Sequence, residues 1–306
     1  KLNTWSPDVF CARLDSDGES IWSWSFSSTM GAGNMELLSL DDDNGLLIAG
    51  SAVIGFEETG DILWSGMTSL PAFGAAADDD GGFLLAVNSS STEGGLDILR
   101  FDEAGDFISG SSFSSGTTQL YNMLRKTDDN GFIVVGLTYT GSIGDLIIVN
   151  LSAELTTDWA KIIETDDIHT VIEDMTQTVD GYVFTGCQDD NQLVMRFSTA
   201  ADIEWTRTIS VPGPDDREIG QHINMVPGGI LVTGLKNFWD EHNHTTQSLL
   251  NTSGQGCFCS DVSLSMTDAD MTSTSITAAI STFSVSTTSV AIETSALSVT
   301  TSYICR

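Results

Sequence analysis

Positively charged side chains are scarce in this sequence. Its 306 residues include 11 Lys and Arg against 43 Asp and Glu, which gives a formal net charge of −32 at pH 7. A surface with this balance repels nucleic acid phosphates and anionic membranes, and it favours solubility, divalent cations and cationic partners. The composition therefore argues against a protein that binds nucleic acid.

Long apolar runs and helical periodicity are absent as well. No apolar run approaches 18 residues, and no stretch keeps a 3.6-residue period. The first absence excludes a transmembrane helix, and the second predicts little helix of any kind. The chain begins at Lys1 and not at Met, from which we expect a processed form that is secreted or held at the cell surface.

Motifs that carry chemistry are also few. The sequence has no His-Glu-x-x-His, no Gly-x-Ser-x-Gly elbow and no phosphate-binding loop. His242 and His244 would share one face of a strand, but no third ligand is fixed by spacing, so an exposed polar loop is preferred to a metal site. Acidic turns at residues 15–18, 41–43 and 78–80 lack the full calcium-loop spacing, and ordinary turn chemistry explains their Asp residues. We predict no cofactor, with Ca²⁺ at these turns as the alternative.

What the sequence does have is a short apolar segment that returns five times. The copies are Gly45–Gly50, Gly82–Val87, Gly131–Gly136, Gly181–Gly186 and Gly229–Gly234. Further short runs accompany each copy, and one of them often carries Trp, as at Trp64, Trp159 and Trp205. These runs are rich in β-branched and aromatic residues and are bounded by Gly, Asp or Asn, which is the pattern of strands and turns. Four strands in a repeat of roughly 37–50 residues predict the blades of a β-propeller.

The repeat also resembles a known family. Asp79-Asp-Gly-Gly-Phe-Leu-Leu85 is followed by Asp97-Ile-Leu-Arg-Phe101 and a turn with Gly105, and similar segments recur over about residues 7–256. This pattern resembles the degenerate, kelch-like propeller repeats of secreted and cell-surface proteins. The resemblance implies a fold and says little about function.

The order of the runs predicts five blades. Residues 33–210 give four full cycles, residues 219–234 give the first two strand types again, and residues 7–27 supply only the last two. Joining residues 219–234 to residues 7–27 would make a composite fifth blade that protects its own edges. The run Ser248–Thr252 is left over, so six blades stay open as the alternative.

The end of the sequence differs in composition from the rest. From residue 260 to residue 306, 22 of 47 residues are Ser or Thr. Apolar residues alternate with Ser and Thr, as in Ile276–Ile280, which is typical of a half-buried strand. We expect a propeller in residues 1–256 and a Ser/Thr-rich β-strand tail or small β-domain in residues 257–306. Its strands would pair within the chain or with a neighbouring subunit.

Five cysteines occur without the paired spacing of a zinc finger. Closure of the propeller would bring Cys11, on the first strand, near Cys257 and Cys259, which follow the last repeat. Cys305 would pin the tail to the same place. We predict disulfides among these four cysteines and leave Cys187 unpaired; buried free thiols are the alternative.

Four sequons are candidates for N-glycosylation: Asn88, Asn150, Asn243 and Asn251. Asn150 takes the place that an Arg holds in sister repeats, which we expect to face solvent. Asn251 matches a turn position, and Asn88 and Asn243 lie in loop segments. Unmodified surface Asn residues are the alternative interpretation.

Inward-facing carboxylates are the remaining candidates for chemistry. Glu36 and Glu173 lie on the runs that lead into a repeat, and five-bladed propellers can host glycoside hydrolases, but spacing does not fix the distance between these two acids. The repeated Trp residues are more typical of core wedges between blades than of sugar platforms. We predict a non-enzymatic extracellular structural or adhesive protein, with the propeller as a rigid spacer and residues 260–306 joining subunits into a fibre or surface layer. A carbohydrate-binding or glycoside-hydrolysing secreted propeller is the alternative.

Overall fold

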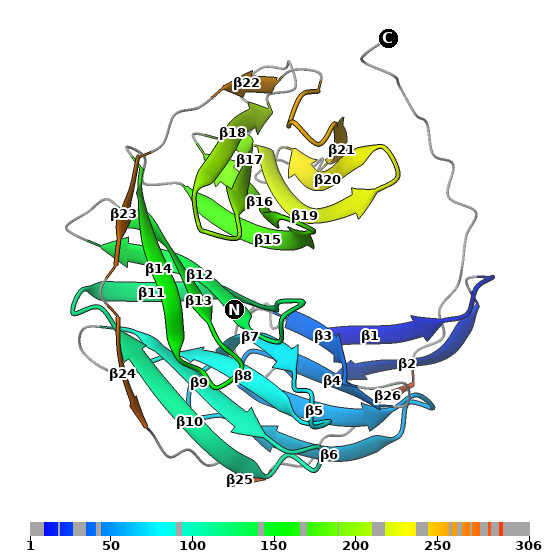
Figure 1. Cartoon of the computed structure of the whole chain (residues 1–306). Helices are drawn as coiled ribbons and strands as arrows, with labels where there is room; N and C mark the ends of the chain where they lie inside the picture. Colours follow the sequence, from blue (N-terminus) through cyan, green and yellow to red (C-terminus); the bar gives the residue numbers. More distant parts are fainter. Residues whose placement is uncertain are drawn as a thin grey trace, which may run out of the picture. The chain divides into compact units, whose positions relative to one another are not determined.

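Every element of secondary structure in the structure, a computed structural model, is a β-strand (Figure 1). The residues that the structure describes are 9–17, 19–26, 35–40, 44–89, 94–139, 144–165, 170–188, 190–209, 218–236, 244–256, 259–261, 265–269, 271–275, 281–282 and 288–289. Within these ranges there is no helix, and hence none that is long and apolar enough to cross a membrane. The prediction of an all-β chain is confirmed.

Four antiparallel sheets contain four consecutive strands each. The first blade is β3 (Met35–Ser39), β4 (Asn44–Ala49), β5 (Ala52–Glu57) and β6 (Ile62–Met67). The second is β7 (Ala72–Ala77), β8 (Phe83–Asn88), β9 (Leu96–Phe101) and β10 (Phe107–Ser114). The third is β11 (Thr118–Lys126), β12 (Phe132–Tyr139), β13 (Gly144–Leu151) and β14 (Thr157–Glu164). The fourth is β15 (Val171–Thr178), β16 (Gly181–Gln188), β17 (Asn191–Ser198) and β18 (Ile203–Ile209).

The fifth blade has three strands: β19 (Glu218–Val226), β20 (Gly229–Lys236) and β21 (His244–Leu250). The chain therefore has the five-blade propeller arrangement that we predicted, but this blade is built differently. The run expected to be left over falls in β21, which pairs with β20 from Leu250 to His244. Because β21 is bonded along that edge of β20, the edge is not free for residues 7–27. Instead β1 (Val9–Leu14) and β2 (Ser20–Phe26) pair with each other in a separate sheet.

One kind of turn follows the third strand of each blade. In the second blade the Asp102 amide donates to the Asp106 carbonyl over 3.0 Å, and the Gly105 amide donates to the Asp102 carbonyl over 3.0 Å. The Asp102 carboxylate also accepts from the amides of Ala104 and Asp106. The fourth residue of this five-residue turn has a left-handed backbone in every blade: Gly60, Gly105, Leu155, Ala201 and Gly254. This is a three-residue hairpin loop closed by a bulge, and the Asp side chains here cap their own turns.

The chain divides into two compact units, each with its own core. Residues 1–88, 97–111 and 275–306 form the first unit, and residues 89–96 and 112–274 form the second. In the first unit Trp64 stacks on Phe83 with ring centroids 5.5 Å apart. In the second, Trp159 and Trp205 pack against separate clusters of buried residues. The prediction that these Trp residues are core wedges agrees with these contacts.

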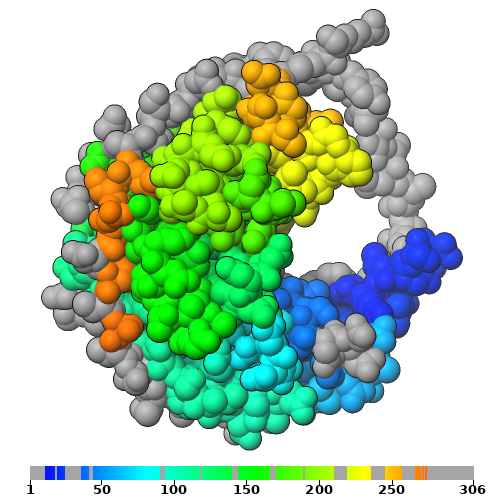
Figure 2. Space-filling model, in the orientation of Figure 1, coloured from blue at the N-terminus to red at the C-terminus, as the bar shows by residue number. Residues whose placement is uncertain are grey.

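The tail strands pair within their own chain. Five short strands each add to the outer strand of another sheet: β22 (Cys259–Asp261) to β18, β23 (Ser265–Asp268) to β14, β24 (Thr272–Ser275) to β10, β25 (Ser281–Thr282) to β6, and β26 (Thr288–Ser289) to β2. Figure 2 shows residues of β23, in orange, directly against the green residues of the third blade. Among the strands described here, none of the tail strands forms a sheet of its own. The tail therefore lengthens existing sheets and is no small β-domain in this part of the chain.

Candidate functional site

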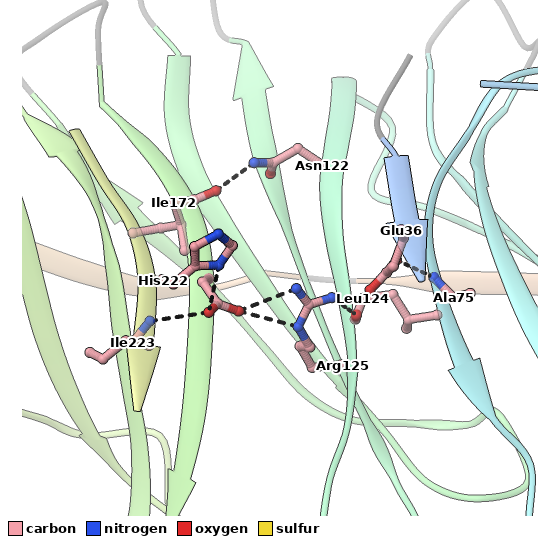
Figure 3. Close-up of polar contacts among 9 residues, drawn as sticks. Glu36, Ala75, Asn122, Leu124, Arg125, Ile172, His222 and Ile223 are labelled. Carbon is pink, nitrogen blue, oxygen red and sulfur yellow. Dashed lines mark hydrogen bonds and ion pairs between the residues drawn. The ribbon is translucent and has the colours of Figure 1, made fainter. Parts of the chain in front are cut away.

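A cluster of polar side chains lies on the first strands of the last three blades, within the second unit (Figure 3). The Asp174 carboxylate, on β15, is 3.2 Å from Nη2 of Arg125 on β11. Its other oxygen accepts from the Ile223 amide of β19 over 3.1 Å and lies 3.7 Å from Nδ1 of His222. Because Asp174 is only 14% exposed, these partners take the place of water around its charge. One carboxylate thus joins three blades.

Bulges in the first strands place these groups. The pairing of β15 with β16 shifts between Ile172 and Asp174, and that of β19 with β20 shifts between Gly220 and His222. A bulge adds one residue to a strand and turns the following side chains. Asp174 and His222 therefore occupy matching positions in neighbouring blades, opposite Thr185 and Thr233. Repeat patterns alone did not reveal this, because a bulge leaves no fixed sequence signature.

The two acids proposed from the sequence are not brought together as a pair. Glu36 lies in the first unit, where its Oε2 accepts from the Ala75 amide over 2.8 Å. Glu173 is the extra residue of the β15 bulge in the second unit. Desolvation raises the pKa of Glu173, His222 lowers it, and the charge of neighbouring Asp174 raises it. Its side chain is nevertheless exposed, so water screens much of these effects.

A cavity of about 340 Å³ lies in the first unit, between the β1–β2 sheet and the first blade. Its lining includes Arg13, Trp22, Leu37, Phe56 and Glu58. Arg13 and Glu58 form an ion pair, and Nε1 of Trp22 donates to the Glu58 carbonyl over 2.9 Å. Leu37 is 56% exposed. The cavity therefore offers one aromatic and apolar wall beside a paired cation and anion.

No group of three or more His, Cys, Asp or Glu side chains in the described part of the chain is arranged to hold a metal ion. The backbone of His244 begins β21, while His242 lies outside the described residues. The acidic turn at Asp15 binds its own backbone: its Oδ1 accepts from the amides of Asp17 and Glu19 over 2.9 Å each. Calcium at such turns stays a prediction.

Cys11 and Cys187 are buried and form no disulfide in the described part of the chain. Burial raises the pKa of the Cys11 thiol, which lowers its reactivity. Cys11 packs in an apolar cluster with Trp24 and Phe56, and its predicted disulfide stays a prediction. Cys257, Cys305 and the side chain of Cys259 lie outside the described residues.

The sequons differ in accessibility. Asn150 is only 8% exposed, so the expectation that it faces solvent is wrong. It lies opposite Trp159 in the β13–β14 pair and hydrogen bonds to the side chain of Tyr182. Asn251 is exposed in the turn after β21, and Asn88 is half-buried at the end of β8. Asn243 lies outside the described residues. Glycosylation stays a prediction, and Asn251 is now its best candidate.

Comparison with known proteins supports the fold and goes no further. No family model and no curated protein matches the chain. A protein of unknown function from Bacteroides caccae is similar in structure, with a TM-score of 0.53 and 12% sequence identity over 84% of this chain and 94% of that one. The periplasmic gluconolactonase PpgL of Pseudomonas aeruginosa gives a TM-score of 0.44 and 10% identity over 87% of this chain and 98% of that one. At 12% sequence identity the first similarity shows the fold alone. The TM-score of the second is too low to support any argument.

Proposed function

We propose that the protein is a non-enzymatic, extracellular structural or adhesive component whose assembly element is the tail, residues 260–306. The observation behind this proposal is that five short tail strands each add to the outer strand of a sheet. A segment that pairs with five such edges through its backbone is suited to strand addition, a common means by which proteins associate. The blades then act as the rigid spacer.

The carboxylates of the inner strands support a role without catalysis. Hydrolysis of a glycosidic bond needs two carboxyl groups at a fixed separation, one acid and one nucleophile or base. Asp174 is held by Arg125 and the Ile223 amide, and Glu36 by the Ala75 amide. These contacts connect neighbouring strands. Among the described residues of its cluster, Glu173 therefore has no second carboxylate beside it that is not already bound to another strand.

Sedimentation of full-length protein over a wide concentration range tests the proposal. We expect particles that grow with concentration, and filaments or layers in negative-stain images of the native material. A variant that ends at residue 259 should stay monomeric, provided its circular dichroism shows the strand content of the parent. The assembly function is wrong if the full-length protein is monomeric at every concentration.

The cavity of the first unit favours one alternative, which is carbohydrate binding. Trp22 and Phe56 offer apolar ring surface, and Arg13 and Glu58 offer polar groups beside it, which together are typical of sugar sites. Leu37→Trp would fill the cavity from its exposed side. Leu63→Trp is the matched control, because Leu63 is 49% exposed and does not line the cavity. A glycan that binds the wild type and Leu63→Trp but not Leu37→Trp would favour this alternative.

A further inference from the structure

The tail repeats with a period of seven residues that matches the blades. Four tail residues lie directly opposite outer-strand residues: Asp261 opposite Arg207, Asp268 opposite Lys161, Thr282 opposite Gly66 and Ser289 opposite Trp24. Asp261 and Asp268 are seven positions apart, Asp268 and Thr282 fourteen, and Thr282 and Ser289 seven. The tail thus meets these sheets in one common register.

The blade residues at these four contacts also correspond to one another. Each follows a Trp of its own strand by two positions, as Arg207 follows Trp205 and Lys161 follows Trp159. Side chains two apart on a strand share a face. Each of these four sheets therefore offers the tail the same position relative to the Trp two residues before it. Seven extended residues span about 23 Å, which allows one contact on each successive sheet.

The sequence of the tail carries the same period. The residue before each of these four contact positions is Ser or Thr: Ser260, Thr267, Ser281 and Thr288. The alternation noted in the sequence is part of this longer repeat. The sequence alone does not indicate this repeat, because a seven-residue spacing in strands has meaning only when the acceptor edges are known.

Charge marks the register on two sheets. Nζ of Lys161 is 2.5 Å from Oδ1 of Asp268, and Arg207 lies opposite Asp261. The whole chain has only 11 Lys and Arg, yet two of them stand opposite tail carboxylates. A slip by one residue would break the Lys161–Asp268 ion pair, move Asp261 from its place opposite Arg207 and turn Met266 to the other face. Met266, which packs against the core of the second unit, opposes the same slip.

The ion pair at Asp268 holds β23 only lightly. The tail strands contain two to four residues, and Asp268 is 85% exposed, so its ion pair adds little on its own. Beside this pair the Ala269 amide donates to the Ala160 carbonyl over 3.0 Å. A strand held by a surface ion pair and a few backbone hydrogen bonds opens locally at low cost. A lightly held tail that fits a repeated edge can fit the same edge on another molecule.

We propose that the outer strands β14, β18, β6 and β2 are acceptor sites for the seven-residue tail repeat. The tail of a second copy of this chain binds these sites in place of the chain's own tail. The inference rests on the proposed assembly function and names its partner and its register. Exchange of identical segments keeps every contact, so the protein concentration decides between the closed monomer and the linked form.

Charge reversal in full-length chains tests the exchange. The acceptor variant carries Lys161→Glu and Arg207→Glu, and the tail variant carries Asp261→Lys and Asp268→Lys. Within either variant, like charges stand opposite each other at positions 161 and 268 and at positions 207 and 261, but the acceptor sites of one variant match the tail of the other. We expect their mixture to associate about tenfold more tightly than either variant alone. Sedimentation with a different fluorophore on each variant measures this.

Net charge needs a control of its own, since the two variants differ by eight charges. Glu154→Lys with Asp158→Lys changes the charge of the chain as the tail variant does, at two exposed positions on the β13–β14 turn and the start of β14. Mixed with the acceptor variant, this control matches only one of the two tail–acceptor pairings, so the two should associate more weakly than the acceptor and tail variants do. Equal association in the two mixtures would overturn the proposed exchange.

A chain with all four reversals separates the two proposals. Opposite charges again face each other at both contacts within this chain, so it should return to wild-type association, and its tail should regain wild-type protection from hydrogen exchange. Restored protection together with equal association in the two mixtures would mean that the sites are correct but serve only the chain's own tail, which also overturns the exchange. Failure of the wild type to assemble at any concentration would instead contradict the proposed function.

Discussion

A Gly in the turn of one sheet faces a Trp of the neighbouring sheet, and this contact recurs along the chain. A Cβ atom added to Gly105 would lie 3.0 Å from the Trp64 ring, and one added to Gly254 would lie 2.7 Å from the Trp205 ring. Both glycines also have a left-handed backbone, which other residues adopt at a cost. The turn of one sheet therefore receives the Trp of the sheet before it. Nε1 of Trp64 completes the contact by donating to the Glu103 carbonyl over 2.9 Å.

The first prediction concerns this contact. Gly105→Ala should destabilise the protein by about 2–4 kcal/mol, because backbone strain adds to displacement of the Trp64 ring. Gly116→Ala is the matched control: its φ of 74° is similar to the 81° of Gly105, and no atom lies within 4 Å of an added Cβ. Strain alone should cost this control about 1–2 kcal/mol. Urea unfolding measures both, and equal losses would mean that the ring contact contributes nothing.

The second prediction concerns Glu173 and pH. Desolvation raises the pKa of its carboxyl in the folded protein, so the folded state binds this proton more tightly than the unfolded state does. Folding is then disfavoured as pH rises through the ordinary range of a Glu. Glu173→Gln should stabilise the protein at pH 7 by a few tenths of a kcal/mol, a small gain because the side chain is exposed. The gain should vanish below about pH 4; an equal gain at pH 3 and pH 7 would contradict this origin.

Asn150 shows why a position can be predicted and its environment missed. It shares its place with Arg196, and both lie opposite a Trp on the next strand, Trp159 and Trp205. A long Arg side chain can reach past the Trp to polar partners, and Arg196 does so at Asp180 and Glu204. A short Asn cannot, so it stays beneath its neighbours and bonds to Tyr182. The Arg196 side chain is itself only 11% exposed, so the position is enclosed in both repeats, and a charged residue in a sister repeat does not show that the position faces solvent.

At the scale of elements, the strands were predictable because local patterns determine them. Gly-flanked apolar runs and polar turns gave the blade strands, and the wedge role of Trp64, Trp159 and Trp205 followed from size. The partner of an edge is not local information. β21 and β1 both look like third strands of a blade, and only the pairing of β21 with β20 decides between them. The bulges that bring Asp174 to His222 were invisible for the same reason.

The third prediction tests the link that Asp174 makes among three blades. Asp174→Asn keeps the size of the side chain and removes the charge that Arg125 and the Ile223 amide share. We expect a loss of about 1–3 kcal/mol, since charge-assisted bonds in a half-buried site are the stronger ones. Asp180→Asn is the control, because Asp180 pairs with Arg196 but is 66% exposed and should cost at most about 1 kcal/mol. Similar losses in chemical denaturation would mean that the cluster adds no more than a surface pair.

At the scale of the whole molecule, one sign of charge dominates. A net charge of −32 over 306 residues places like charges within reach of one another, and their repulsion opposes every compact state. The few cations are placed where they relieve it: Arg100 pairs with Asp78, Arg125 with Asp174 and Lys161 with Asp268. Most carboxylates have no cation to pair with, because there are about four acids for each base.

The last prediction follows from this imbalance. Raising NaCl from about 10 mM to about 150 mM shortens the screening length from about 30 Å to about 8 Å, which should weaken the repulsion more than it weakens a few short ion pairs. We expect the melting temperature of the monomer to rise by several degrees over this range. A fall would mean that the ion pairs outweigh the repulsion.

Comparing 1 mM CaCl₂ with 1 mM MgCl₂ at constant ionic strength separates screening from binding of a specific ion. Equal melting temperatures are expected if the acidic turns only cap their own backbone. A higher melting temperature in Ca²⁺ would mean that carboxylates such as those at residues 78–80 bind that ion.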